Sequence, residues 1–114
     1  MSFYYNPKTI SNATVAIPNT TKQIIVDITS KSLSAFSGIE QSTVDATELF
    51  YIQVGSEGNI KLTYDGTDPS TSDSIMIPAD TTVFPIEGNE NIKNIQLVYE
   101  TVNVTCVVWF ERMV

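Results

Sequence analysis

Apolar and polar residues alternate along much of this chain with a period of two, the period of a β-strand with one face toward a core. The clearest example is LFYIQV, residues 49–54, in which Phe50, Ile52 and Val54 occupy every second position. Less regular runs of the same kind are found at residues 22–28, 59–65, 74–78, 81–86, 92–100 and 102–110. Together with the turn residues between them, these runs predict about eight short strands.

The run nearest the C-terminus, VNVTCVVWFE (residues 102–111), is apolar on both faces. One face is apolar from Val104 to Phe110, and the other gains bulk from Val107 and Trp109. A strand of this kind lies in the middle of its sheet, or it covers something beyond its own sheet. Val107 and Trp109 are therefore candidates for contact with another protein. The alternative is that a loop of the same domain covers them.

Two turns are expected in the second half of the chain. GSEG, residues 55–58, separates two alternating runs and predicts a β-hairpin between them. A second turn is expected at Thr101–Asn103, before the final strand. Residues 31–38 fit a short strand or a turn, and residues 39–48 fit an irregular loop or one helical turn. No segment has the period of an amphipathic helix.

Composition supports strands over helices. Val and Ile account for 24 of the 114 residues, whereas Leu accounts for 4. Branching at Cβ restricts χ1 and suits the pleated surface of a sheet. The length allows one domain with one core. We therefore predict an all-β fold, an antiparallel β-sandwich of the jelly-roll or Greek-key type, over residues 12–114, after an N-terminal arm at residues 1–11.

The arm carries Phe3, Tyr4 and Tyr5 on an otherwise polar stretch. Aromatic side chains give a large contact area at low entropic cost, so these residues are candidates for docking on a neighbouring subunit. The alternatives are a strand packed on its own domain and a disordered end. The run that follows, ATVAIP at residues 13–18, also alternates, and Pro18 suits the end of an edge strand.

The formal net charge is −7, with six basic residues and no histidine. Binding to nucleic acid or to a membrane surface needs clustered basic side chains, so neither partner is expected. No apolar run reaches the roughly 20 residues that span a bilayer, and the start MSFYYNPK lacks the features of a signal peptide. The single cysteine, Cys106, makes no internal disulfide. The chain is thus expected to be made and kept in a cytoplasm, or exported within something larger.

The residues that catalysis requires are scarce. Without histidine, the Ser-His-Asp and Cys-His arrangements of nucleophilic catalysis are excluded. Cys106 lies mid-strand without basic neighbours and is expected to be a small buried hydrophobe. The glycine-containing segments match neither a phosphate-binding loop nor a dinucleotide-binding fingerprint. We expect no enzymatic activity and no cofactor.

One loop, in KLTYDGTDPSTSDS (residues 61–74), gathers three aspartates. Asp65, Asp68 and Asp73 are candidate calcium ligands, but their spacing differs from that of a calcium loop, where ligands alternate around a sharp turn. A glycosidase pair of carboxylates is a further alternative, and no pattern in the sequence supports it.

A turn explains the same loop more simply. Asp65 can cap its own backbone, Gly66 can accept a positive φ, and Pro69 ends strand pairing. One other use stays open, because Tyr64 beside Asp65 and Asp68 would suit carbohydrate binding by a host-adhesion module.

The second half of the chain resembles small structural proteins of tailed bacteriophage particles. The resemblance begins with a strand that runs into a DGTxP[ST] motif, followed by a short polar loop and a further strand. A glycine-bearing turn, a strand of the pattern i-x-n-i-x-l and a closing strand that ends in an aromatic and an acidic residue complete it. Here these elements read IKLTYDGTDPST, IMIPADTTVFPIEG, NIKNIQLVYE and VNVTCVVWFE, within residues 49–112.

The resemblance implies a non-enzymatic virion protein that decorates or stabilises the capsid, or an accessory part of the neck or tail. Its expected partners are the major capsid protein or other virion proteins, and a homo-oligomer is expected because shells present repeated identical sites. It would be made in the cytoplasm of the host bacterium. Because an acidic protein is poorly placed against packaged DNA, the charge of −7 favours the outer surface of the capsid.

Overall fold

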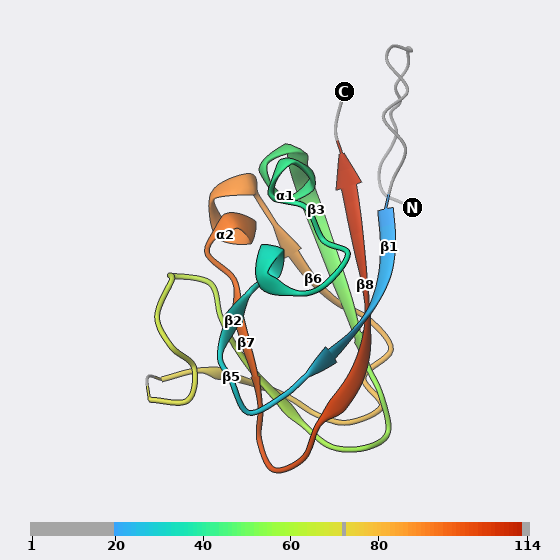
Figure 1. Ribbon diagram of the computed structural model, residues 1–114, viewed down its shortest axis with the longest axis vertical. Helices are drawn as coiled ribbons and strands as arrows, with labels where there is room; N and C mark the ends of the chain where they lie inside the picture. The colour runs from blue at the N-terminus through green and yellow to red at the C-terminus, as the bar shows by residue number, and fades with distance from the viewer. Residues whose placement is uncertain (1–19, 72, 113–114) are drawn as a thin grey trace.

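The computed structural model describes residues 20–71 and 73–112, which form eight strands, two short α-helices and one 3-10 helix (Figure 1). The strands make two antiparallel sheets of four strands each, so the predicted all-β sandwich is confirmed. The predicted arm at residues 1–11 and the alternating run at residues 13–18 lie outside the described residues.

Sheet A contains the longer strands. Its order is β1 (Thr20–Val26), β8 (Val104–Arg112), β3 (Thr47–Val54) and β6 (Phe84–Glu87). Sheet B is built from shorter strands, in the order β2 (Lys31–Ser32), β7 (Gln96–Tyr99), β4 (Ile60–Thr63) and β5 (Ile75–Ile77).

The strand pairs show how the chain is wound. β1 pairs with β8, β2 with β7, β3 with β6, and β4 with β5, all antiparallel. The first four strands therefore pair with the last four in reverse order, as in one long hairpin rolled across two sheets. This strand order is that of a jelly roll.

The hairpin predicted around residues 55–58 is wrong, because β3 and β4 lie in different sheets. The Gly55 N–H donates a hydrogen bond to the Thr105 carbonyl at 2.9 Å, and the Gly55 carbonyl accepts one from the Asp80 N–H at 3.0 Å. A Cβ at Gly55 would come within 2.5 Å of that Thr105 carbonyl. Glycine thus allows the backbone to lie against β8 while the chain crosses to sheet B. The turn expected at Thr101–Asn103 is present, and it too connects the two sheets.

The core lies between the sheets and follows the predicted alternation. Phe50 and Phe110, on adjacent strands, are fully buried with ring centroids 5.4 Å apart. Cys106 is 1% exposed on the same face of β8 as Phe110, and its expected role as a buried hydrophobe is confirmed. Burial of apolar surface of this kind stabilises the fold by roughly 25 cal/mol per Å².

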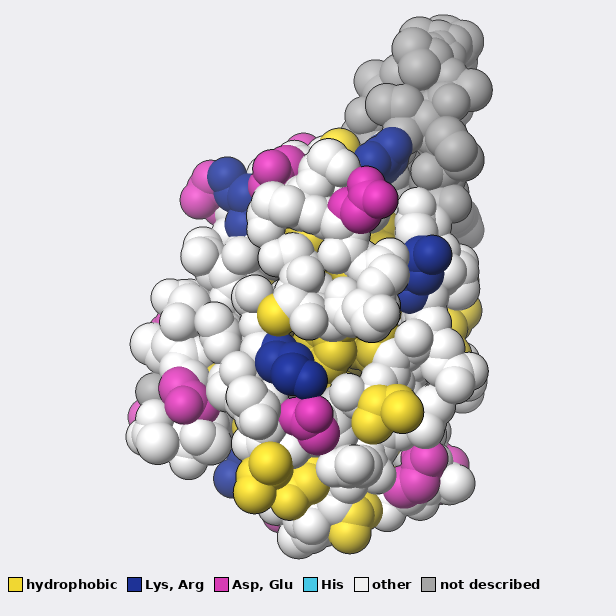
Figure 2. Space-filling model, viewed as in Figure 1, with side chains coloured by type: hydrophobic (Ala, Val, Ile, Leu, Met, Phe, Trp, Pro, Cys, Tyr) yellow, Lys and Arg dark blue, Asp and Glu magenta, His cyan; other side chains and the backbone are white. Residues whose placement is uncertain are grey.

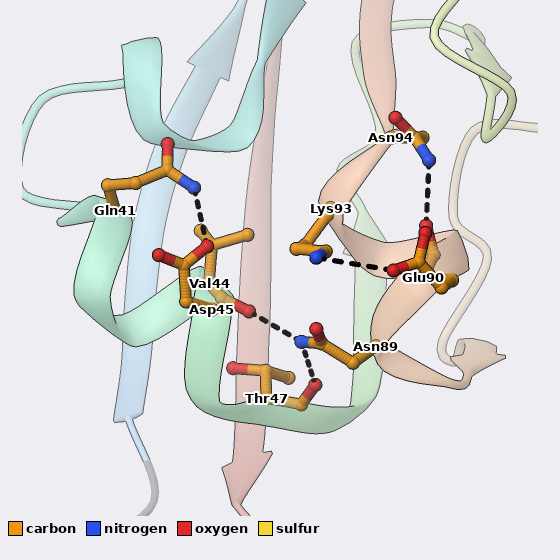
Figure 3. Close-up of polar contacts among 8 residues, drawn as sticks. All are labelled: Gln41, Val44, Asp45, Thr47, Asn89, Glu90, Lys93 and Asn94. Carbon is orange, nitrogen blue, oxygen red and sulfur yellow. Dashed lines mark hydrogen bonds and ion pairs between the residues drawn. The ribbon is translucent and has the colours of Figure 1, made fainter.

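The helices close one end of the sandwich, beside the upper parts of β3 and β8 in Figure 1. They are η1 (Leu33–Ala35), α1 (Gln41–Ala46) and α2 (Asn89–Lys93). The Asn89 side-chain amide donates hydrogen bonds to the carbonyls of Val44 and Thr47, at 3.0 and 2.7 Å (Figure 3). These bonds satisfy carbonyls at the C-terminal end of α1 and hold α2 against it.

α1 agrees with the helical alternative for residues 39–48, whereas α2 was not predicted. The strand expected at residues 92–100 begins only at Gln96. Ile92 and Ile95 are both buried, and a spacing of three places two residues on one side of a helical turn. In so short a segment this spacing is easily mistaken for part of a strand.

Candidate functional site

The outward face of sheet A carries a row of apolar side chains from three neighbouring strands. Trp109 of β8 pairs in register with Tyr51 of β3, and Tyr51 pairs with Pro85 of β6. The Trp109 and Tyr51 rings meet edge to face, with centroids 6.5 Å apart and an interplanar angle of 85°. Val107 lies on the same face because side chains alternate along a strand. We call Val107, Trp109, Tyr51 and Pro85 the outer row.

The outer row is partly open to solvent. Val107, Trp109 and Tyr51 are half-buried and Pro85 is exposed. Ile25 of β1, which is 55% exposed, extends the apolar surface toward the edge of the sheet. β8 lies between β1 and β3, so the prediction of a central strand is confirmed. That Val107 and Trp109 contact another protein stays a prediction.

Acidic residues border the outer row at one end. Leu49, two residues before Tyr51 on β3, pairs with Glu111 on one side and with Glu87 on the other. Burial raises the pKa of the Tyr51 hydroxyl, and the charges of Glu111 and Glu87 raise it further. Burial also raises the pKa of Glu111. The Tyr51 hydroxyl therefore stays protonated at neutral pH and is available as a hydrogen-bond donor to a partner.

The aspartates of the loop after β4 are engaged in local turns. Asp65 Oδ1 accepts hydrogen bonds from the backbone and the hydroxyl of Thr67. Asp68 Oδ1 does the same with Ser70, at 2.8 and 2.7 Å. These bonds lower the pKa of both carboxyls. With Gly66 at a φ of +84°, the turn interpretation of this loop is confirmed.

The same loop is fixed to the sandwich at several points. The Thr63 hydroxyl donates a 2.6 Å hydrogen bond to the Thr67 carbonyl. The Gly66 N–H donates to the Asn94 carbonyl at 3.0 Å, and Pro69 is buried. The conformation of the loop is thus held by hydrogen bonds within the domain.

A shallow depression of about 370 Å³ lies beside this loop. Tyr64, which is 44% exposed, lines it together with Asp65, Asp73 and Ser74. Asp68 is not among its lining residues. The structure thus brings two of the three candidate calcium ligands to one depression. Among the described residues there is no group of three or more acidic, Cys or His residues able to hold a metal ion.

Cys106 is unsuited to nucleophilic chemistry. Burial raises the pKa of its thiol to about 12, so almost no thiolate is present at neutral pH. The remaining predicted contact residues, Phe3, Tyr4 and Tyr5, lie outside the described residues.

Sequence reasoning missed Tyr51 and Pro85 as members of the outer row. Both stand at outward positions of their runs, but only the pairing of β3 with β8 and β6 places them beside Trp109. Strand order is not encoded in the periodicity of a single run, so alternation alone could not have found the row.

Comparisons with known proteins give no further identification: no family model, curated protein or solved structure matches the chain. None of the helices in the described part of the chain is long and apolar enough to span a membrane.

Proposed function

We propose that this protein is a non-enzymatic structural component of a bacteriophage particle, which decorates or stabilises the capsid through protein–protein contacts. The observation that carries the proposal is the outer row on sheet A. Trp and Tyr are the residues that most often dominate the energy of a protein interface. Here they are paired edge to face in the middle of a surface that the domain itself does not need for its core.

The jelly-roll order is compatible with this proposal. The topology occurs in viral capsid proteins and in lectins. It is therefore compatible both with a structural virion protein and with a carbohydrate-binding module, and the fold alone does not choose between these two functions. The choice rests on the outer row, on the resemblance to virion proteins in residues 49–112, and on the charge of −7, which favours the outer surface of the shell.

Particle binding tests the proposal directly. Particles that lack the protein are incubated with purified variants, and bound protein is quantified after sedimentation. Trp109→Ala and Tyr51→Ala together should lower the affinity at least about tenfold, which corresponds to about 1.4 kcal/mol. The matched control is Met76→Ala, which removes a 41%-exposed side chain from sheet B. Thermal unfolding shows whether each variant is folded, and full occupancy by a folded double variant would contradict the proposal.

The arm is tested in the same assay by deleting residues 1–10, which removes Phe3, Tyr4 and Tyr5. If these aromatics dock on a neighbouring subunit, the truncated protein should bind particles more weakly than the full chain. Unchanged occupancy would eliminate the arm as a contact element and leave the outer row as the proposed binding surface.

A second candidate function, carbohydrate binding by a host-adhesion module, is favoured by the depression beside Tyr64. An exposed tyrosine ring can stack on the apolar face of a sugar, while the carboxylates of Asp65 and Asp73 can accept hydrogen bonds from its hydroxyls. A glycan array, probed with and without calcium, tests this function. Binding that is lost in Tyr64→Ala and kept in Val102→Ala, an exposed residue elsewhere, supports it; no binding to any glycan rejects it.

A further inference from the structure

The outward face of sheet A carries acidic but no basic residues in the described part of the chain. At one end of the outer row, Glu111 of β8 and Glu87 of β6 stand on either side of Leu49. The basic residues of the four strands occupy the alternate positions, whose partners in register are buried; these residues are Lys22 and Arg112. The charge at this end of the face is therefore of one sign.

The other end of the outer row is also acidic. A depression of about 440 Å³ opens beside Val107, and its charged lining residues are Glu57 and Asp80, which are both exposed. Hydrogen bonds from its own backbone N–H and from the Thr105 hydroxyl lower the pKa of the Glu57 carboxyl, so this carboxyl is ionised at neutral pH. Thr105 and Glu111 lie about 20 Å apart along β8, at about 3.3 Å per residue. The apolar outer row thus lies between two acidic ends.

We propose that the outward face of sheet A binds a different protein, whose contact surface is apolar in the middle and carries Lys or Arg side chains toward both ends. This inference rests on the proposed capsid function and adds the chemistry of the partner. A partner that covers Trp109 and Tyr51 also covers the carboxylates beside them. Removal of a carboxylate from water is costly unless a counter-charge takes the place of the water. Lys and Arg side chains supply that charge, and complementary charges of this kind select the partner and its orientation.

A second copy of this chain is a poor partner for the same face. A two-fold dimer brings the same patch of both copies together. Because both ends of this patch are acidic, an acidic end of one copy meets an acidic end of the other, whichever way the strands of the two copies run. Like charges that face each other across an interface are unfavourable. The charge pattern therefore favours a basic partner over self-association through this face.

This pattern is not simply a consequence of the net charge of −7. Figure 2 views the sandwich from the side of β1 and β2, and there Lys and Arg side chains stand among the acidic ones. One such pair joins Lys31 Nζ to Asp27 Oδ2 at 3.0 Å. Basic residues are thus present on other surfaces of the domain, and the described part of the outward face of sheet A lacks them.

Graded changes of charge in the particle-binding assay test the inference. Glu87 and Glu57 are replaced singly, first by Gln and then by Lys. If the partner surface is basic, the affinity should fall in the order Glu, Gln, Lys at each position, with a loss of at least about fivefold for each lysine variant. The matched control is Glu40→Lys, the same change at an exposed residue before α1 and outside the strands of sheet A. This control should bind as the unsubstituted protein does.

The outcomes separate this inference from the proposed function. Suppose that the folded lysine variants keep full affinity, or lose no more than the glutamine variants, while the Trp109→Ala and Tyr51→Ala double variant loses binding. This result would overturn the inference and leave the capsid function standing. If the unsubstituted protein does not bind particles, the proposed function is contradicted and the inference falls with it. Thermal unfolding shows which variants are folded.

Self-association of the purified protein gives a second, independent measurement. Light scattering compares the molar mass of the unsubstituted protein with that of the Trp109→Ala and Tyr51→Ala double variant, in the absence of particles. The two masses should be equal, because no second copy is expected to cover the outer row. A smaller mass for the folded double variant would show that this face joins copies of the chain, and would overturn the inference.

Discussion

The two sheets of this sandwich share one core but differ on their outward faces. On sheet A the centre of the outward face is aromatic, with Trp109 paired to Tyr51. On sheet B the corresponding position is Lys61, which pairs in register with Val98 and Met76. A lysine in the middle of a sheet face keeps its ammonium group in water and discourages a protein partner. The outward face of sheet A is thus centred on an aromatic pair, whereas that of sheet B is centred on a lysine between the buried Val98 and the exposed Met76.

The largest expected effect separates the two faces of β8. Phe110→Ala removes a fully buried ring that lies 5.4 Å from Phe50, and should lower the free energy of unfolding by about 3–5 kcal/mol. Trp109→Ala, one residue away on the outward face, should cost much less because its ring is only half-buried. Urea denaturation of both variants measures the difference. Equal losses would mean that Trp109 belongs to the stabilising core and would remove the basis for a contact face.

A smaller effect is expected where the chain crosses from sheet A to sheet B. Gly55→Ala would place a Cβ within 2.5 Å of the Thr105 carbonyl, and relief of that contact should cost about 1–3 kcal/mol. Ser56→Ala, at the exposed neighbouring position, should change the free energy of unfolding by less than about 0.5 kcal/mol. Denaturant titration of the two variants is the measurement. A Gly55→Ala protein as stable as the Ser56→Ala protein would show that the crossing does not need glycine.

The next prediction concerns the aromatic pair itself. A double-mutant cycle on Tyr51 and Trp109 should give a coupling free energy of about 0.5–1.5 kcal/mol, because edge-to-face pairs stabilise beyond their buried area. The same cycle on Lys61 and Met76 of sheet B should give little coupling, since neither side chain offers a ring contact. If both cycles gave the same small coupling free energy, the aromatic pair would add nothing to sheet A that Lys61 and Met76 do not add to sheet B. The contrast between the two outward faces would then be contradicted.

The smallest effect is a dependence on pH. Burial raises the pKa of Glu111 in the folded protein, so the folded state binds its proton more tightly than the unfolded state does. Glu111 therefore lowers stability once it is ionised, and this penalty is relieved as the pH falls from the raised pKa toward the ordinary value of about 4.3. The difference in unfolding free energy between Glu111→Gln and the unsubstituted protein should be larger at pH 7 than at pH 4. A difference in unfolding free energy that stays constant between pH 4 and pH 7 would contradict the raised pKa of Glu111.

The parts of the fold that depend on local pattern were predictable. The alternation of Phe50, Ile52 and Val54 identified β3 and its buried face, and the turn at Asp65 and Gly66 followed from the chemistry of these residues. Local pattern does not report which strands are neighbours. A glycine loop between two alternating runs therefore suggested a hairpin, whereas the bond from Gly55 to Thr105 sends the chain to the other sheet.

The candidate site was predictable to a similar extent. Val107 and Trp109 were recognised because a strand apolar on both faces is unusual, and their outward position is now clear. Tyr51 joined them only through the register of β3 with β8. The sequence also does not tell which strands lie at the edges of the two sheets, because edge positions follow from strand order and not from the composition of one strand.

We propose that sheet A, and not sheet B, is the face of this protein that other proteins of the particle cover. A cryo-EM reconstruction of the intact particle tests it most directly. We expect a jelly-roll density on the outer surface of the capsid, with Trp109 and Tyr51 against a neighbouring chain and Lys61 toward solvent. Density on the DNA-facing side, or a bound orientation in which Lys61 is covered and Trp109 faces solvent, would contradict it.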